Sequence, residues 1–315
     1  MATSQKLTEH LLTLGQDTDK LCRALEDLQL GEIHVQDDDV LDLKAAPVLQ
    51  DTINVTVAGD AGGGAPADVT VLEVNGIDTV VVTDCNNKSV KSFYTRNSQP
   101  GHSKLSLEGG PWGITRLKHN QVAVTVLDTS QIVTVEVNPD LVLLSTITTS
   151  KQYWGITSLT PSALAASAES PPCVDILDMS GHVLRSVCPD HEGGHILLCP
   201  CFLCTTRTGN ILVSDNGTKC VVCLTLEGDV VFKYRPTGDT ALKDPLGITS
   251  TSTGDILVTD TSQHRVIHLT QSGQFVRNIL TSQDGVHHPW GLCVGGRGRM
   301  YLCASDGVKV FTCCK

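Results

Sequence analysis

Residues 245–279 read PLGITSTSTGDILVTDTSQHRVIHLTQSGQFVRNI and contain the clearest structural pattern in the chain. It consists of short Val, Ile, Leu and Thr runs separated by Gly, Asp and Ser, which is the pattern of β-strands joined by tight turns. It opens with Pro-x-Gly-Ile, has a Gly-Asp turn before ILVTD, a polar tip with Arg265, and a Ser-Gly turn before a fourth run. The stretch therefore predicts one four-stranded β-sheet.

Related stretches recur along the chain from about residue 52. Six times a β run ends in an acidic residue followed by a short polar tip, at Asp84, Asp128, Glu169, Asp215, Asp260 and Asp306. The separations of 44, 41, 46, 45 and 46 residues suit one propeller blade per repeat rather than a helical solenoid unit. The sequence predicts an all-β, six-bladed β-propeller over residues 52–315.

A second motif precedes the acid in four of the six repeats. Its copies are Pro111-Trp112-Gly113-Ile114, Tyr153-Trp154-Gly155-Ile156, Pro245-Leu246-Gly247-Ile248 and Pro289-Trp290-Gly291-Leu292. The first repeat lacks it, and the fourth has Cys-Phe-Leu-Cys in its place. On these residues, the unit at 245–279 resembles an NHL repeat along its whole length.

The last repeat runs through VKVFTC and stops after three strands. A three-stranded blade leaves an open edge, which closed propellers avoid. Residues 53–57, in DTINVTV, form a β run outside any repeat. We expect this run to pair on the outside of the last blade and close the ring.

The N-terminal 30 residues have a different pattern. Leucines and one threonine recur at alternating steps of four and three, the a/d seam of a coiled coil, at Leu7, Leu11, Leu14, Thr18, Leu21, Leu25 and Leu28. The pattern predicts a short amphipathic helix over residues 1–30, followed by an acidic, solvated linker over residues 31–51. Self-association through the seam and packing on the same chain both remain open.

A coiled coil and acidic linker before an NHL propeller resemble the C-terminal part of tripartite-motif (TRIM-NHL) proteins. The RING and B-box zinc modules of that family have no counterpart, because only Cys22 precedes Cys85. The resemblance implies a place in a ubiquitin-ligase assembly, with ligase activity supplied by a partner. The chain itself is then expected not to be an enzyme.

Charge and cysteine content narrow the classes of partner and compartment. The net charge is −11, but residues 1–60 hold 12 acids and 4 bases, leaving 22 against 19 in residues 61–315. A near-neutral propeller disfavours RNA. No apolar run approaches the length of a membrane span, and no secretory signal is evident at the start. The 13 irregularly spaced cysteines then indicate a reduced, cytoplasmic protein.

Three motifs imitate chemical sites. His191-Glu192-Gly193-Gly194-His195 matches a zinc-protease pattern, but its two glycines disfavour the helix that such a site needs, and the repeats place it in a loop. Cys201 with Cys204, and Cys220 with Cys223, have zinc-ribbon spacing but fall on predicted strands. We expect packed thiols there, with a zinc or redox site as the alternative. No cofactor or metal is expected.

The loops before the inner strands and the tips between the second and third strands of each blade should share one face. They carry the candidate partner-binding residues Lys88, Lys219, His264, Arg265, Trp112, Trp154 and Trp290. The tryptophans could be exposed there or packed between blades. Aromatic rings beside polar tips are typical of a protein interaction face.

The predicted function is therefore a non-catalytic interaction or scaffold propeller, as the substrate-recognition part of a TRIM-like assembly. One alternative is an RNA-binding propeller, using a basic patch of Lys88, Lys91, Arg96 and Lys104 on the first blade. Another is a six-bladed hydrolase or lyase. Such enzymes need carboxylate, Asn or His ligands in the central channel, and the aligned inner strands from Gly113, Gly155, Gly247 and Gly291 offer none.

Overall fold

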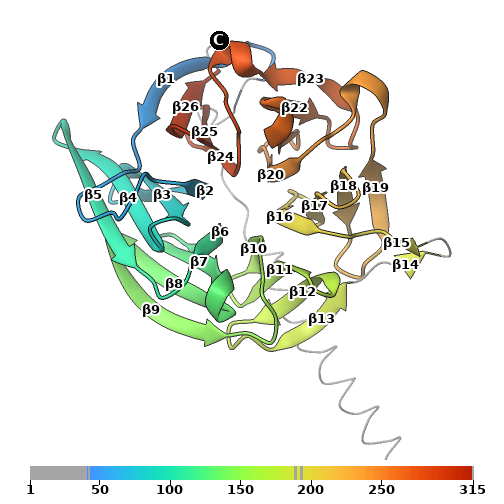
Figure 1. Cartoon of the computed structure of the whole chain (residues 1–315), viewed down its shortest axis with the longest axis horizontal. Helices are drawn as coiled ribbons and strands as arrows, with labels where there is room; N and C mark the ends of the chain where they lie inside the picture. Colours follow the sequence, from blue (N-terminus) through green and yellow to red (C-terminus); the bar gives the residue numbers. More distant parts are fainter. Residues whose placement is uncertain (1–40, 42, 188–189, 192–193, 314–315) are drawn as a thin grey trace, which may run out of the picture.

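The structure, a computed structural model, describes residues 41, 43–187, 190–191 and 194–313. Six four-stranded sheets are arranged as blades around a central axis (Figure 1). The fold class predicted from the repeats is confirmed. The predicted N-terminal helix and most of the linker lie outside the described residues. Within the described residues, no helix is long and apolar enough to cross a membrane.

The first three blades follow one another in the chain. Blade 1 contains β2 (Pro66–Val74), β3 (Ile77–Asp84), β4 (Ser89–Arg96) and β5 (Gln99–Ser106). Blade 2 contains β6 (Pro111–Lys118), β7 (Gln121–Val126), β8 (Gln131–Asn138) and β9 (Asp140–Thr148). Blade 3 contains β10 (Ile156–Thr160), β11 (Ala163–Glu169), β12 (Pro172–Asp178) and β13 (Val183–Val187).

A small hairpin of β14 (Asp190–His191) and β15 (Gly194–His195) precedes the other three blades. Blade 4 contains β16 (Pro200–Thr205), β17 (Ile211–Asp215), β18 (Cys220–Leu224) and β19 (Val230–Tyr234). Blade 5 contains β20 (Pro245–Ser250), β21 (Ile256–Asp260), β22 (Arg265–Leu269) and β23 (Phe275–Leu280). Blade 6 contains β24 (Leu292–Gly295), β25 (Arg299–Ala304), β26 (Gly307–Thr312) and, outermost, β1 (Val48–Ile53).

The N-terminal strand closes the ring, as expected, but it lies five residues before the predicted run. β1 pairs antiparallel with β26, from Val48 opposite Thr312 to Ile53 opposite Val308. The pairing ends at Ile53 because β26 begins at Gly307. Beyond it, Val55 is buried in the cluster between blades 6 and 1, and its carbonyl accepts a hydrogen bond from Lys91 Nζ of blade 1 at 2.8 Å. Residues 54–57 therefore join two blades instead of extending the sheet.

The end of the predicted linker is also packed rather than solvated. Leu41 and Leu43 are buried in the cluster between blades 5 and 6. Arg277 Nη2, from β23, donates to the carbonyls of Leu43 and Ala45 at 2.6 and 2.8 Å. Leu41 and Leu43 thus pack their apolar side chains between blades 5 and 6.

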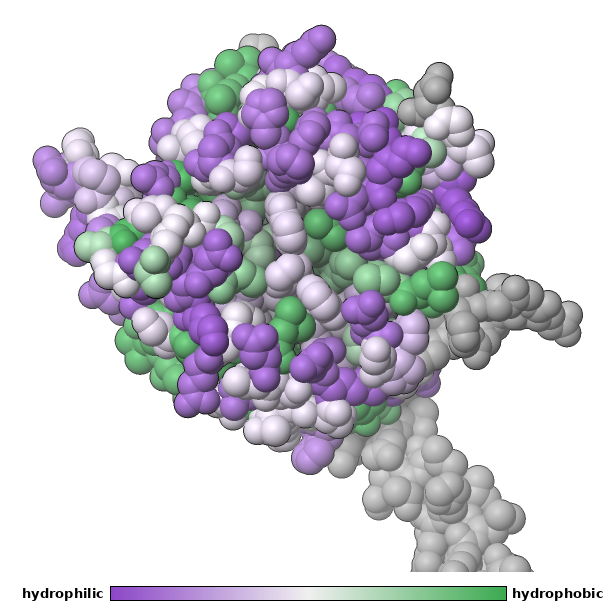
Figure 2. Space-filling view, in the orientation of Figure 1, coloured by the Kyte–Doolittle hydropathy of each residue, from purple (hydrophilic) through white to green (hydrophobic). Residues whose placement is uncertain are grey.

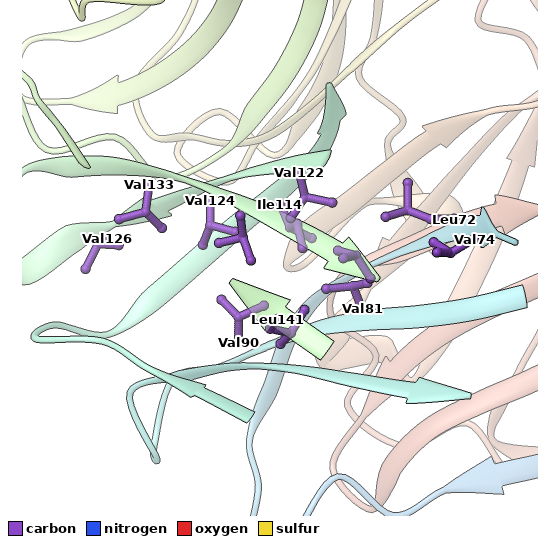
Figure 3. Close-up of a cluster of buried hydrophobic side chains, with 12 residues drawn as sticks. Leu72, Val74, Val81, Val90, Ile114, Val122, Val124, Val126, Val133 and Leu141 are labelled. Atoms are coloured by element: carbon purple, nitrogen blue, oxygen red, sulfur yellow. The ribbon is translucent and has the colours of Figure 1, made fainter. Parts of the chain in front are cut away.

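The core lies between neighbouring blades, where sheet faces pack against each other. Figure 3 shows the cluster between blades 1 and 2, in which Leu72, Val81 and Val90 meet Val122 and Val124. The second strand of each blade has both faces covered, so β17 and β21 are buried throughout. Each fully buried Val or Leu side chain contributes on the order of 1.5–3 kcal/mol. The outer strands keep exposed apolar residues, as on the rim over β9 in Figure 2.

The glycine of the Pro-x-Gly-Ile motif lets inner strands touch. A Cβ on Gly155 would lie 2.3 Å from the Cys201 carbonyl oxygen, and one on Gly247 would lie 2.2 Å from that of Trp290. Blades 1 and 4 carry Asp68 and Phe202 at the corresponding place. The motif is therefore a close-packing signature around the axis.

Hydroxyl groups on the second strands of blades 1 to 5 join each of these blades to the next one. Thr83 Oγ1 donates to the Trp112 carbonyl at 2.6 Å, Thr125 Oγ1 to that of Trp154 at 2.6 Å, and Ser167 Oγ to that of Cys201 at 2.9 Å. The same bond joins Ser214 to Leu246, and Thr259 to Trp290 at 2.8 Å. These bonds fix the backbone at the start of the inner strands.

The acidic residues that the sequence analysis treated as one repeated feature occupy two kinds of position in the structure. Asp84, Asp215 and Asp260 are buried at the ends of second strands, opposite Pro66, Pro200 and Pro245. In blade 2 the residue opposite Pro111 is Val126. In blades 2, 3 and 6 the acid lies one or two residues beyond the equivalent strand position and is exposed, namely Asp128, Glu169 and Asp306.

Candidate functional site: the top face

The starts of the inner strands and the tips between second and third strands lie on one face, because these strands are antiparallel and Pro245 pairs with Asp260. We call this the top face. At its centre, six equivalent positions lie at or just before the start of each inner strand and form what we call the mouth ring. Its members are Ala67, Trp112, Trp154, Cys201, Leu246 and Trp290.

The three tryptophans of the mouth ring come together from blades 2, 3 and 6. The Trp112 ring lies edge-on to Trp154, with centroids 4.8 Å apart, and to Trp290, with centroids 5.3 Å apart. Trp112 and Trp290 also pack on the cluster that contains Phe202 and Leu246. All three rings stay partly exposed. The two alternatives from sequence are thus combined, since the rings pack on one another and still present surface.

A β-bulge includes the mouth-ring residue in blades 1, 2, 4 and 5, namely Ala67, Trp112, Cys201 and Leu246. The register shifts between Pro111 and Ile114 in blade 2, and between Pro245 and Ile248 in blade 5. A bulge re-aims a side chain away from the regular alternation of a strand. The ring centre is filled by side chains of intermediate hydropathy (Figure 2).

Lys88, Lys219 and His264 occupy equivalent places, each with a left-handed backbone (φ 43, 55 and 52°) just before the third strand. Both lysines are exposed. Lys88 Nζ donates to the Glu108 carbonyl at 3.4 Å, and Lys219 Nζ donates to the Asn216 side chain. The tips therefore present these residues on the top face, as the repeat pattern predicted.

His264 belongs to a histidine cluster that sequence analysis did not assemble. Its ring centroid lies 4.3 Å from that of His288 and 6.0 Å from that of His287. The backbone N–H of His288 donates to His264 Nδ1 at 3.0 Å. The cluster joins the tip of blade 5 to the loop that leads into blade 6.

Arg265 is not a surface anchor, which corrects the prediction. Its side chain is buried, and its Nη2 donates to Asp260 Oδ2 at 2.9 Å and to the Ala241 carbonyl at 2.9 Å. Asp260 also accepts the backbone N–H groups of Lys243 and Asp244. The guanidinium satisfies a buried carboxylate and fixes the loop before β20, so Arg265 supports the face from below.

The proposed basic patch on blade 1 does not exist. Lys91 is fully buried, and its Nζ contacts Asp60 at 2.6 Å and Asp84 at 2.5 Å. Lys104 pairs with the other oxygen of Asp60 at 2.7 Å. Burial alone would raise the pKa of Asp60, but hydrogen bonds from Lys104 and Lys91 hold it well below its usual range. Arg96 ends β4, at the opposite face from Lys88.

Asp68 is the residue that sequence analysis missed. It lies on inner strand β2, where four other blades have glycine, and its carboxylate accepts the backbone N–H groups of Ile114 and Val69 at 3.0 and 2.9 Å. Burial raises its pKa to about 7. Alignment of Pro66-Ala67-Asp68-Val69 with Pro-x-Gly-Ile would have found it. Through its hydrogen bond from Ile114, this carboxylate connects blade 1 to blade 2.

The motifs that imitate chemical sites lie where predicted. His191 ends β14 and His195 ends β15, between blades 3 and 4, with His191 opposite Gly194. Cys201 and Cys204 lie on β16, and Cys220 and Cys223 on β18. Burial raises the pKa of Cys223 to about 11. In the part of the chain that the structure describes, no three His, Cys, Asp or Glu side chains are arranged to hold a metal ion.

Fold and site together define the class of this protein as a six-bladed β-propeller with a tryptophan-lined top face. Residues 242–269, in blade 5, match the family model of the NHL repeat. No curated protein sequence matches the chain significantly.

Solved structures share the fold. A virginiamycin B lyase from Staphylococcus aureus has a TM-score of 0.60 at 13% identity over 83% of this chain and 98% of its own. A chain of the nidogen–laminin complex has a TM-score of 0.57 at 17% identity, over 77% and 86%. A protein assigned as a gluconolactonase has a TM-score of 0.60 at 16% identity, over 87% and 94%. At these identities the likeness concerns the fold alone.

Proposed function

We propose that this propeller is a non-catalytic recognition module that binds a protein partner on its top face. The observation that carries the proposal is the group of three partly exposed indole rings, from Trp112, Trp154 and Trp290, in the middle of a face built of irregular loops. Tryptophan is enriched among the residues that dominate protein–protein affinity, especially near the centre of an interface. The rigid propeller beneath holds the three indole groups in fixed positions relative to one another.

The charge of the top face favours a protein partner with a basic segment. Exposed acids outnumber exposed lysines on its loops and tips, with Glu108, Asp128, Glu169, Asp284 and Asp306 against Lys88, Lys219 and Lys243. Phosphate recognition needs the opposite balance. Of the blade 1 cations in the RNA alternative, Lys91 and Lys104 are paired with Asp60 and Asp84, and Lys88 and Arg96 lie at opposite ends of β4, which argues against that alternative.

A catalytic role has less support. The neighbours of known fold include a protein named as a lyase, but both oxygens of Asp68 already accept backbone N–H groups. A general base or metal ligand needs a free oxygen near the reacting atoms. Asp68 is therefore better explained by packing of the inner strands than by chemistry.

The finer function follows from the resemblance to TRIM-NHL proteins. In this proposal the propeller selects the substrate of a cytoplasmic ubiquitin-ligase assembly. The leucine seam of residues 1–30 would add self-association, and a RING-bearing partner would supply the ligase activity. Two linked propellers would bind a repeated target with greater avidity than one.

Affinity purification from cell extract, with and without nuclease, tests the proposal on the wild-type chain, Trp154→Ala and Phe275→Ala. Phe275 is an exposed aromatic residue on outer strand β23, away from the top face, and serves as the matched control. We expect a nuclease-resistant protein whose affinity falls by roughly 1–4 kcal/mol in Trp154→Ala and is unchanged in Phe275→Ala. Recovery that nuclease abolishes would favour RNA, and equal recovery by all three chains would place the binding surface elsewhere.

A further inference from the structure

Two cysteines at the mouth ring lie close enough to react with each other. Cys199 and Cys201 flank Pro200, and their Sγ atoms are 3.8 Å apart. Cys201 is the bulge residue of β16, since Pro200 pairs with Asp215 and Phe202 with Ser214. Alternate residues of a regular strand point the same way but lie far apart along it, so the bulge and the bend at Cys199 bring the two thiols together.

The backbone on both sides of the pair is held in place. The N–H groups of Leu198 and Cys199 donate to Asp215 Oδ2 at 2.8 and 3.0 Å. The Cys199 carbonyl accepts from Asn216 N at 2.9 Å, and the Cys201 carbonyl accepts from Ser167 Oγ at 2.9 Å. These hydrogen bonds fix the backbone of the loop and therefore keep the two sulfur atoms close together.

The two thiols differ in exposure and acidity. Cys199 is partly exposed, whereas Cys201 is 7% exposed. The hydrogen bond between them lowers the pKa of Cys199, and that bond together with burial raises the pKa of Cys201. Burial raises the pKa of Cys85 to about 12 and of Cys173 to about 11. Since the thiolate is the nucleophile, Cys199 has the properties of an attacking thiol and Cys201 those of a resolving thiol.

We propose that Cys199 and Cys201 form a redox-active dithiol that closes reversibly to a disulfide at the mouth ring, with a small-molecule disulfide such as glutathione disulfide as oxidant. The Cys199 thiolate attacks one sulfur of glutathione disulfide, forms a mixed disulfide and releases a glutathione thiolate. The Cys201 sulfur, losing its proton to solvent, then attacks Cys199 Sγ and releases the second glutathione. Two cysteine thiols are oxidised, and one glutathione disulfide is reduced to two thiols.

The closed form should be easy to reduce. A disulfide needs its sulfurs about 2 Å apart, so the Sγ atoms must approach by about 2 Å, and a ring across a single proline is strained. Strained disulfides have high potentials and are the labile ones. Cys201 packs in the same cluster as Phe202, Trp112 and Trp290. Oxidation therefore changes the packing around the indole rings, whatever partner the top face binds.

The test exposes the folded chain to glutathione disulfide and locates each modification by tandem mass spectrometry of alkylated peptides. Residue-level mapping is needed because Cys188, which shares a tryptic peptide with the pair, lies outside the described residues. Wild-type protein should lose two hydrogen atoms across Cys199 and Cys201, with a change in tryptophan fluorescence that dithiothreitol reverses. Cys199 should react at least about tenfold faster than buried Cys220.

The single variants separate the two roles. Cys201→Ser should accumulate a stable glutathione adduct on Cys199, because no resolving thiol remains. Cys199→Ser should form neither the crosslink nor an adduct on Cys201. Cys220→Ser, a buried thiol on β18, is the control and should behave as wild type. A crosslink to Cys204 instead, or no adduct on Cys199 in Cys201→Ser, would overturn the proposal. If a variant fails to fold, locating the crosslink in the wild-type protein by mass spectrometry still tests the proposal.

Discussion

Replacement of Lys91 by methionine tests how the closing segment is attached to blade 1. Lys91 is one of the largest fully buried side chains among the described residues, and its Nζ bonds the Val55 carbonyl, Asp60 and Asp84. Methionine is similar in length and keeps the apolar contacts, but it removes the charge and all three hydrogen bonds. Asp84 is then left buried without a counter-ion, while Asp60 keeps Lys104.

Removing one partner of a buried ion pair costs about 3–5 kcal/mol, because the remaining charge stays desolvated. We expect Lys91→Met to lower the free energy of unfolding by about 3 kcal/mol or more. At about 2–4 °C per kcal/mol for a chain of this size, the melting temperature should fall by about 6–12 °C. Lys104→Met is the matched control. Lys104 is partly exposed and its loss leaves Asp60 paired with Lys91, so we expect less than about 1 kcal/mol.

The effect should depend on pH in a defined direction. Burial alone would raise the pKa of Asp84, but hydrogen bonds from Lys91 and Asn87 lower it. A carboxyl group whose folded pKa is lowered stabilises the fold fully above its unfolded pKa of about 3.9 and loses this contribution as the pH falls through the folded pKa. In Lys91→Met the buried carboxyl gains stability on protonation. The difference in unfolding free energy between wild type and variant should therefore be smaller at pH 3.5 than at pH 7.

Urea unfolding and differential scanning fluorimetry at pH 7 and pH 3.5, on wild type, Lys91→Met and Lys104→Met, measure these differences. Equal destabilisation by the two substitutions at pH 7 would refute the assignment of Lys91 as the buried anchor. A gap between wild type and Lys91→Met that widens in acid would refute the electrostatic explanation.

Three other outcomes follow from the packing. Arg265→Ala should lower the free energy of unfolding by roughly 2–4 kcal/mol, and with it the melting temperature, because its carboxylate partner Asp260 is buried. A melting temperature unchanged in fluorimetry would refute this buried role of Arg265. Gly155→Ala should cost on the order of 1–3 kcal/mol in urea unfolding, since its Cβ meets backbone of the next blade, whereas Gly63→Ala, with open space around it, should be neutral. Deleting residues 1–40 should leave a cooperative unfolding transition by circular dichroism. Deleting residues 1–53 removes β1 and should yield aggregated or non-cooperative protein; identical transitions would disprove closure.

The repeats could be read from the sequence because strand and turn preferences are local. Short β-branched runs, Gly-Asp turns and the Pro-x-Gly-Ile motif each depend on a few neighbouring residues, so they identify blades without knowledge of contacts. The three-stranded last repeat required a closing strand, and one was found. Its place at Val48–Ile53 depended on where β26 begins and where Val55 meets Lys91, which lies 36 residues further along the chain.

The functional surface was predicted only in part. The placement of Lys88, Lys219 and the three tryptophans on one face followed from strand direction, which the repeat register determines. Whether a charged side chain meets solvent or a carboxylate does not follow from register. Arg265 and Lys91 looked like surface cations, yet each is held by a buried aspartate.

The short distance between the sulfur atoms of Cys199 and Cys201 depends on a β-bulge, which local residue preferences did not predict. Local residue patterns thus predicted the repeat, the blade and the face. The tertiary structure decided which polar groups remain available on that face, because desolvation and pairing arise from contacts between segments that are distant in the chain.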